Sequence, residues 1–385
     1  MAQHKLEKGF DLHRQGNLPE AKIMYDSFLA ENPLHFDALH LSGLVSYEMG
    51  ALAEAESLFL KAIDVKADFA QIYLSYARVL RDLQRHEEEL ICYQTAIALD
   101  AQDFEAFFNQ GVLLQIQNRL DEALIAFEKA ITLDPDRPEA FSNRGLVLHG
   151  LGRLEEAVAS FSQALSIRSF YPEAQCNRGN ALMALQRFDE AVESYVTAAL
   201  IRPDFVEAFY NCGLAYQKMG RGAEAVVWFE KTLCLKPDYL EAYFDRGVVL
   251  RWLGRCAEAM LSYHQAICVN SRYAEAYFNL ADLLRAAEKP EEALANYDAC
   301  LSIKPDFADA LSNRGNILKG LRRFDEAMES YERVIALDPR HATAYANRAI
   351  LLKDLNRAEE ALASYGWAIA SDPHYALAYN NRGII

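Results

Sequence analysis

The sequence repeats itself with a fixed step of 34 residues from end to end, without insertion or deletion. A glycine or alanine returns at one place in the repeat: Gly111, Gly145, Gly179, Gly213, Gly247, Ala281, Gly315, Ala349 and Gly383. Twelve positions after the first of these, Ala123 begins a series of alanines, and Phe127 begins a series of phenylalanines and tyrosines. A period of this length indicates a solenoid built from one small structural unit.

Segment 104–137 shows what that unit is. The apolar pattern predicts one helix over about 105–116, a turn at 117–119, and a second helix over about 120–133. On the second helix, Ala123, Phe127 and Ala130 lie on one face. Pro135 follows, and a proline cannot continue a helix. Two helices of this length cannot bury their apolar faces alone, so neighbouring units must cover them.

This period, with these small and aromatic residues, resembles the tetratricopeptide repeat (TPR) family. The resemblance implies an all-α solenoid of helix-turn-helix units that winds into a right-handed superhelix, and a single domain over 1–385. The expected units are 2–35, 36–69, 70–103, 104–137, 138–171, 172–205, 206–239, 240–273, 274–307, 308–341 and 342–375, with a partial unit at 376–385.

The composition of the chain argues against several classes of binding partner. The net charge is −16, which argues against nucleic acid or an anionic membrane surface as the main partner. The first residues form no apolar signal segment, and no apolar run is long enough to span a membrane. Seven scattered cysteines without a C-x-x-C pair fit a reducing compartment, so we expect a cytoplasmic protein.

Motifs that carry chemistry are missing from the sequence. It contains no glycine-rich phosphate loop, no nucleophile elbow and no H-E-x-x-H, and its nine histidines are scattered singly. We therefore expect no catalytic residue, no metal site and no cofactor, and we do not expect this chain to be an enzyme.

The candidate site is a polar row on the first helix of each unit. It consists of Asn109, Asn143, Asn177, Asn211, Asp245, Asn279, Asn313, Asn347 and Asn381. Asparagine is a mediocre helix former, so its recurrence in mid-helix needs a reason. A carboxamide both donates and accepts, so such a row can bind the backbone of an extended peptide. The alternative is that each asparagine bonds to the next unit and stiffens the solenoid.

The TPR resemblance implies that the first helices line a concave groove. In O-linked N-acetylglucosamine transferases an asparagine at this repeat position forms a ladder that holds substrate peptides, and the matching residues here are the row just given. The first three units depart from it, with Glu7, Leu41 and Ser75. The lysine that chaperone-binding TPR proteins carry one position earlier is also missing, so a chaperone C-terminus is not expected.

Charged residues that flank the asparagine row can be explained either by ion pairs within the chain or by ligand binding. An acid precedes the asparagine by one turn (Glu105, Glu139, Glu173, Glu207, Glu241, Glu275, Asp309), and an arginine often follows it (Arg144, Arg178, Arg246, Arg314, Arg348, Arg382). We favour structural pairing for the arginines and leave the acids open. A basic residue such as Arg119 before each second helix is expected to complement the C-terminal dipole of the first helix. The third unit is irregular, with Glu89 in place of alanine.

Two functions follow from the sequence. The first is a scaffold that binds extended or helical segments of other proteins in its groove. The second is the substrate-recruiting portion of a protein O-linked N-acetylglucosamine transferase-like (SPINDLY-type) glycosyltransferase whose catalytic domain lies beyond Ile385. Segment 35–50 resembles the N-terminal units of such bacterial proteins. The sequence stops within a first helix at Ile385, so we also expect either a longer natural polypeptide or self-association through the uncapped last unit.

Overall fold

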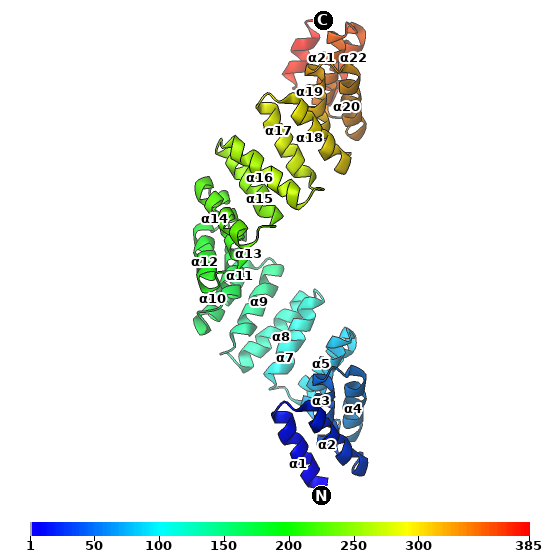
Figure 1. The fold of residues 1–385 in the computed structure, drawn as a ribbon, viewed down its shortest axis with the longest axis vertical. Coiled ribbons are helices and arrows are strands. Elements are labelled where there is room, and N and C mark those ends of the chain that lie inside the picture. The colour runs from blue at the N-terminus through cyan, green and yellow to red at the C-terminus, as the bar shows by residue number, and fades with distance from the viewer. Residues whose placement is uncertain (1) are drawn as a thin grey trace. The chain divides into compact units, whose positions relative to one another are not determined.

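The computed structural model describes residues 2–385, and every regular element in that range is a helix (Figure 1). The helices fall into two compact units, one ending at Pro203 and the other beginning at Asp204. The first unit holds α1 (Ala2–Arg14), α2 (Leu18–Glu31), α3 (Phe36–Glu48), α4 (Leu52–Val65), α5 (Ala70–Asp82), α6 (His86–Leu99), α7 (Phe104–Ile116), α8 (Leu120–Leu133), α9 (Pro138–Gly150), α10 (Leu154–Ile167), α11 (Pro172–Ala184) and α12 (Phe188–Ile201).

The second unit continues the same alternation of a 13-residue and a 14-residue helix. It holds α13 (Val206–Lys218), α14 (Gly222–Leu235), α15 (Leu240–Trp252), α16 (Cys256–Val269), α17 (Ala274–Ala286), α18 (Pro290–Ile303), α19 (Ala308–Gly320), α20 (Phe324–Leu337), α21 (Ala342–Asp354), α22 (Ala358–Ser371) and α23 (Ala376–Arg382). The all-α architecture of paired helices is confirmed, while one continuous superhelix over 1–385 stays a prediction.

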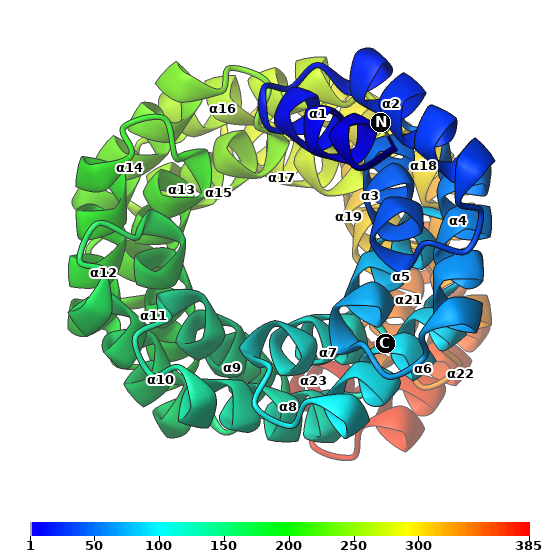
Figure 2. The ribbon, with the colours of Figure 1, turned by 90° about the horizontal axis from the view of Figure 1, so that it is seen from below.

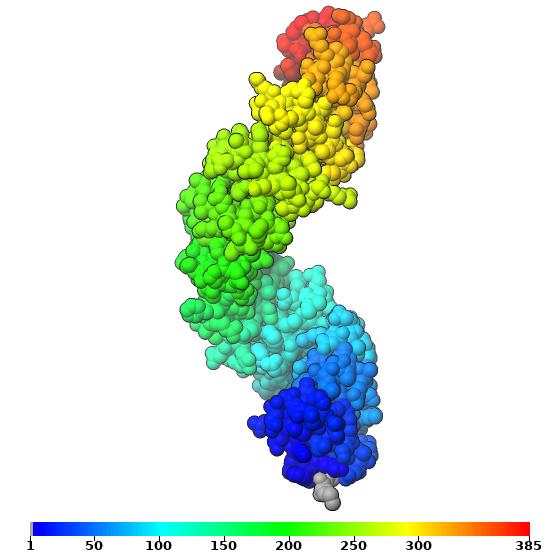
Figure 3. All heavy atoms as spheres, viewed as in Figure 1, coloured from blue at the N-terminus to red at the C-terminus, as the bar shows by residue number. Residues whose placement is uncertain are grey.

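Within each unit the odd-numbered helices lie on the inner side and the even-numbered helices on the outer side (Figure 2). Successive odd-numbered helices approach one another, for example α7 with α9 and α19 with α21. Side chains fill the spaces between successive helix pairs in each unit (Figure 3). The odd-numbered helices therefore form a continuous inner face in each unit, and the polar row of the sequence lies on them.

In each helix pair an aromatic ring of the second helix packs against the backbone of the first helix, at the repeated glycine or alanine. Phe161 is fully buried on α10, and its Cε1 would lie 2.7 Å from a Cβ added to Gly145 on α9. Such closeness requires a small residue on the first helix. Ala281 and Ala349, both fully buried, show that one methyl group can be accommodated at this place. The repeated Gly or Ala thus sets how near the two helices of a pair can come.

A tyrosine at this aromatic position brings a hydroxyl group into the core. Tyr195 donates to Asn180 Oδ1 at 2.7 Å, and Tyr331 donates to Asn316 Oδ1 at 2.9 Å. In both cases the partner is the residue 15 positions earlier, on the first helix. Where that residue is apolar, as for Tyr263 with Val248 in this place, the buried hydroxyl has no partner. The pairing of tyrosine with a polar residue 15 positions earlier is a signal that the sequence analysis missed.

The turn inside each helix pair has one left-handed residue. It is glycine in some units, such as Gly152 with φ 73°, and a longer residue in others, such as Asn118 with φ 59°. Glycine adopts this conformation without strain, whereas other residues adopt it at a cost. The turn therefore keeps its geometry even where the sequence does not supply the best residue.

The basic residue before each second helix forms an ion pair that the sequence analysis did not predict. Arg119 is the N-cap of α8, and its guanidinium bonds Glu122 through Nε at 2.7 Å and Nη2 at 2.8 Å. The same pairing recurs in Arg85–Glu88, Arg153–Glu156, Arg187–Glu190, Arg221–Glu224, Arg255–Glu258, Lys289–Glu292, Arg323–Glu326 and Arg357–Glu360. These ion pairs support a structural role for the basic residue, and its interaction with the dipole of the first helix stays a prediction.

A pair of identical substitutions tests the role of the aromatic ring. We expect Phe161→Ala to lower the free energy of unfolding by about 3–5 kcal/mol, because it leaves a cavity where two helices meet. Phe170→Ala removes a side chain that is 79% exposed and should stay within about 0.5 kcal/mol of the parent. Urea titrations followed by circular dichroism measure both, and equal losses would contradict this account of the packing.

Candidate functional site

The polar row predicted from the sequence lies on the inner face in both units. Its nine members are on α7, α9, α11, α13, α15, α17, α19, α21 and α23, one on each helix, and all nine side chains are half-buried. The structure therefore places them as a row, with each unit contributing its own stretch. What differs between the two units is whether the side chains already have partners.

In the second unit several members of the row are held by bonds within the chain. Asn279 donates from Nδ2 to the carbonyl of Glu275 at 2.8 Å, and its Oδ1 accepts from Arg251 at 3.2 Å. Asn313 donates to Asp282 on the preceding first helix at 3.1 Å. These bonds fit the alternative hypothesis, in which the row stiffens the array.

Asp282 is the centre of this polar network, and the sequence analysis did not single it out. Its carboxylate accepts from the Tyr297 hydroxyl at 2.5 Å and from Asn313 at 3.1 Å. Arg251 and Arg285 approach it at 3.5 and 3.8 Å. The side chain is only 12% exposed, so three hydrogen-bond donors and the nearby Arg285 cation compensate the cost of burying its charge. The tyrosine rule given above would have identified it.

In the first unit the asparagine side chains of the row make no such bonds within the described part of the chain. Asn109, Asn143 and Asn177 make no side-chain hydrogen bond within residues 3–385, the part of the chain whose side chains are described. They lie on α7, α9 and α11, three consecutive first helices. Each presents a half-buried carboxamide with both its donor and its acceptor available. Asn347 in the second unit is similar, whereas Asn211 has a partner.

A cavity of about 360 Å³ opens beside Asn109, between α5 and α7 of the first unit. Its lining residues are Gln71, Leu74, Ser75, Arg78, Arg81, Glu105 and Asn109. The sequence analysis identified Asn109 and Glu105, but it treated Ser75 only as a departure from the row and did not single out the two arginines. The cavity extends the candidate site from the carboxamide row toward α5.

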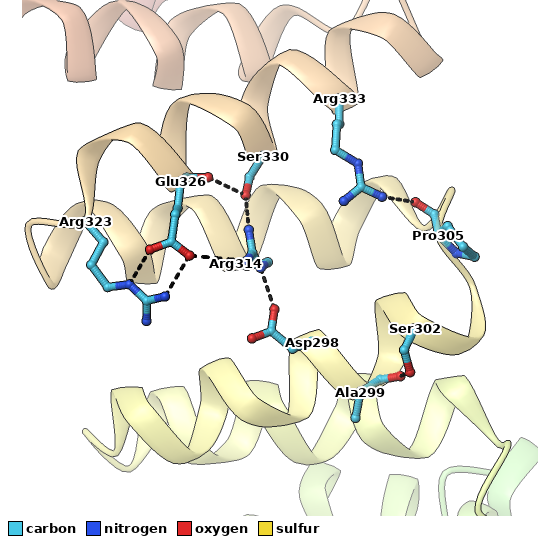
Figure 4. Close-up of polar contacts among 9 residues, drawn as sticks. All are labelled: Asp298, Ala299, Ser302, Pro305, Arg314, Arg323, Glu326, Ser330 and Arg333. Atoms are coloured by element: carbon cyan, nitrogen blue, oxygen red, sulfur yellow. Dashed lines mark hydrogen bonds and ion pairs between the residues drawn. The ribbon is translucent and has the colours of Figure 1, made fainter.

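The arginine that follows the polar row is a structural tie in several repeats. Arg178 donates to Ser194 at 3.1 Å and Arg246 to Ser262 at 3.0 Å. Arg314 lies between three helices, where it bonds Asp298 at 2.6 Å and Ser330 at 2.7 Å (Figure 4). These bonds confirm the structural interpretation for those three arginines and remove them from the candidate site.

The acidic row has a divided role. Glu139 pairs with Arg168 at 2.5 Å, Glu173 pairs with Arg202, and Glu275 lies 3.9 Å from Lys304. These basic residues lie at the end of the second helix of the same repeat, so the pairs join its two helices. Glu105, in contrast, makes no ion pair within the described side chains and lines the cavity.

Other kinds of site were sought in the same residues. No group of three or more His, Cys, Asp or Glu side chains that could hold a metal ion is found within the described part of the chain. None of the helices described there has the length and apolar character needed to cross a membrane.

Models of known families match most of the chain. Models described as tetratricopeptide repeat match residues 308–341, 92–125, 70–103, 274–307 and 6–68. A model described as TPR repeat matches residues 113–152, 149–186 and 179–220. Together these matches cover well over half of the chain. A search of curated proteins gives no match.

Several solved structures are similar to parts of the chain. YrrB, described as a TPR protein with an unusual peptide-binding site, is 26% identical, with 48% of this chain and 95% of that chain covered and a TM-score of 0.44. The MamA protein is 23% identical, with coverages of 44% and 92% and a TM-score of 0.42. PilF of Pseudomonas aeruginosa is 20% identical, with coverages of 52% and 92% and a TM-score of 0.45.

Asp245 offers a test of the electrostatics of the row. Burial raises the pKa of its carboxyl group above the usual value, and the hydrogen bond from the Tyr210 hydroxyl, at 2.6 Å, offsets only part of that rise. A carboxyl group whose folded pKa is raised favours folding when protonated, so the wild type loses stability as pH rises from the unfolded toward the folded pKa.

We therefore expect Asp245→Asn to be more stable than the parent at pH 7, since its carbonyl can still accept the Tyr210 hydrogen bond. The difference should shrink as pH falls below about 4, where the carboxyl of the unfolded parent also becomes neutral. Thermal unfolding at several pH values measures it. An advantage that grows toward low pH would contradict the assignment.

Proposed function

This chain belongs to the tetratricopeptide repeat family, and from that premise we propose that it is a protein-interaction scaffold whose first unit binds an extended segment of a partner protein. The observation that carries the proposal is the row of three unpaired carboxamides, Asn109, Asn143 and Asn177, on consecutive first helices. An extended backbone presents N–H and C=O groups at regular intervals, and a carboxamide can pair with both.

The chemistry of the row supports recognition of backbone rather than of particular side chains. A hydrogen bond contributes about 1 kcal/mol when its partners would otherwise bind water, so several must act together. Three half-buried carboxamides on a rigid array satisfy that requirement at little cost in conformational entropy. The proposed ligand is therefore an extended segment that spans at least α7, α9 and α11, and binding needs no catalytic group.

The second unit has a different part in the proposal. Asn279 and Asn313 are already bonded within the chain, so a ligand would have to displace those bonds to use them. We assign these two residues to the stiffness of the array. The recruiting portion of a glycosyltransferase, our second hypothesis, would use the same inner face; no particular contact favours it, and it stays a prediction, as does cytoplasmic location.

Two multiple variants separate binding from stiffness. We expect Asn109→Ala, Asn143→Ala and Asn177→Ala together to weaken binding of a fluorescein-labelled, capped nonapeptide of Ala, Ser and Gly at least ten-fold, because about 1 kcal/mol is lost at each position. Stability should change by less than about 0.5 kcal/mol for each substitution. Fluorescence anisotropy and urea unfolding give the two readouts.

The matched control is Asn279→Ala with Asn313→Ala. It should keep peptide affinity within two-fold of the parent but lose about 1 kcal/mol of unfolding free energy for each lost bond. If the first-unit triple variant binds the nonapeptide as well as the parent does, the proposed site is wrong.

A further inference from the structure

The third repeat breaks the sequence pattern at its most constrained place. Ten units carry a fully buried alanine where α6 carries Glu89, and the Glu89 side chain is likewise 0% exposed. A buried carboxylate costs several kcal/mol unless it is paired and hydrogen-bonded. Local rules that a fold otherwise obeys are most often broken where function requires it.

The partners of Glu89 show what a glutamate does in place of the usual alanine. Its Oε1 accepts from Arg81 Nε at 2.8 Å and from the Tyr93 hydroxyl at 3.0 Å, and its Oε2 lies 3.2 Å from His86 Nδ1. Arg81 also donates from Nη2 to the Tyr93 hydroxyl at 2.5 Å. The guanidinium of Arg81 is thus fixed on two sides while its side chain stays 40% exposed.

Arg81 and Arg78 together line the cavity between α5 and α7. Arg78, one turn earlier on α5, is exposed. Its guanidinium carbon lies 4.8 Å from the centre of the Tyr47 ring. It forms no ion pair within the described side chains, so stacking orients it while its charge remains available. Two oriented guanidinium groups therefore line one cavity.

The groups on the remaining walls suit a peptide better than a free anion. Asn109, across the cavity on α7, is the first member of the unpaired carboxamide row, and Gln71 offers a second carboxamide from α5. Glu105 supplies an acceptor at the rim for a ligand N–H. A free anion would use only the arginines, whereas a carboxylate side chain on an extended backbone would use all of these groups.

We propose that this cavity is a subsite for an acidic side chain of the bound segment. Arg78 binds the carboxylate through two parallel hydrogen bonds, and Arg81 adds a second cation from a fixed position. Glu89 is a positioning residue that holds Arg81 through its buried carboxylate. The inference rests on the proposed function and deepens it: the partner segment carries an Asp or Glu where it passes α5 and α7.

A matched pair of peptides tests the subsite. One is a capped, fluorescein-labelled nonapeptide of Ala, Ser and Gly with Glu at positions 4 and 6, and the other has Gln at both positions. For the parent protein we expect at least five-fold tighter binding of the Glu peptide by fluorescence anisotropy, with a preference that declines as salt rises. Arg78→Ala should abolish the preference and leave the affinity for the Gln peptide unchanged.

Arg14→Ala is the matched control, since Arg14 is an exposed arginine on α1 of the same unit and lies outside the cavity. It should leave the preference intact. If Arg78→Ala and Arg14→Ala lower the preference equally, the cations act only through net charge and the subsite is overturned.

Glu89→Ala separates positioning from simple attraction, and it introduces the alanine that the other units carry. Removing a negative charge raises the positive potential of the cavity, so attraction alone predicts a stronger preference for the Glu peptide. Positioning predicts a weaker preference, because Arg81 is released. A stronger preference would overturn the role of Glu89.

The two proposals fail differently. Equal binding of the Glu and Gln peptides by the parent, with both lost in the Asn109, Asn143 and Asn177 triple variant, would overturn the acidic subsite and leave the peptide-binding function standing. Binding of neither peptide to the parent would overturn both.

Discussion

Each helix pair depends on one contact, in which an aromatic ring of the second helix packs on the backbone of the first. At Gly145 and Phe161 the two approach so closely that only a very small residue can stand on the first helix. Because every repeat closes in this way, each repeat presents its helices in the same orientation to the next one. The opposite side of each first helix is left outside the core, and the polar row lies there.

Members of the same row differ in their bonding because their neighbours differ. Asn313 has Asp282 on the preceding first helix and bonds to it, whereas the corresponding place before Asn143 is Val112. A carboxamide without a neighbouring partner remains available to a ligand. Whether a member of the row is bonded within the chain therefore depends on its own neighbours, such as Asp282 for Asn313 and Arg251 for Asn279.

The 34-residue period was sufficient to predict the fold of each repeat. In segment 104–137 the first helix begins at Phe104, one residue earlier than expected, and the second helix has the predicted bounds. The row of asparagines was also placed correctly on the first helices. These features depend on periodicity and proline position, which act within one repeat and are visible in the sequence alone.

What the sequence analysis missed depends on contacts that a repeat pattern does not show. The nine positions of the row look equivalent when they are compared at a step of 34 residues. Differences among them come from contacts with residues 28 or 31 positions earlier. Glu89 was noticed as an irregularity, but its pairing with Arg81 could be recognised only once α5 and α6 were placed together. Side-chain networks between helices are where the structure adds most.

We propose that Asn109, Asn143 and Asn177 contact the ligand and that Asn279 and Asn313 do not. Side-chain amide NMR on the full chain, with asparagine-selective ¹⁵N labelling, observes each Nδ2 group directly during titration with the Glu nonapeptide. We expect the side-chain amide signals of Asn109, Asn143 and Asn177 to shift, with those of Asn279 and Asn313 unchanged. Shifts confined to Asn279 and Asn313, or to Asn296 on the outer helix α18, would contradict this proposal.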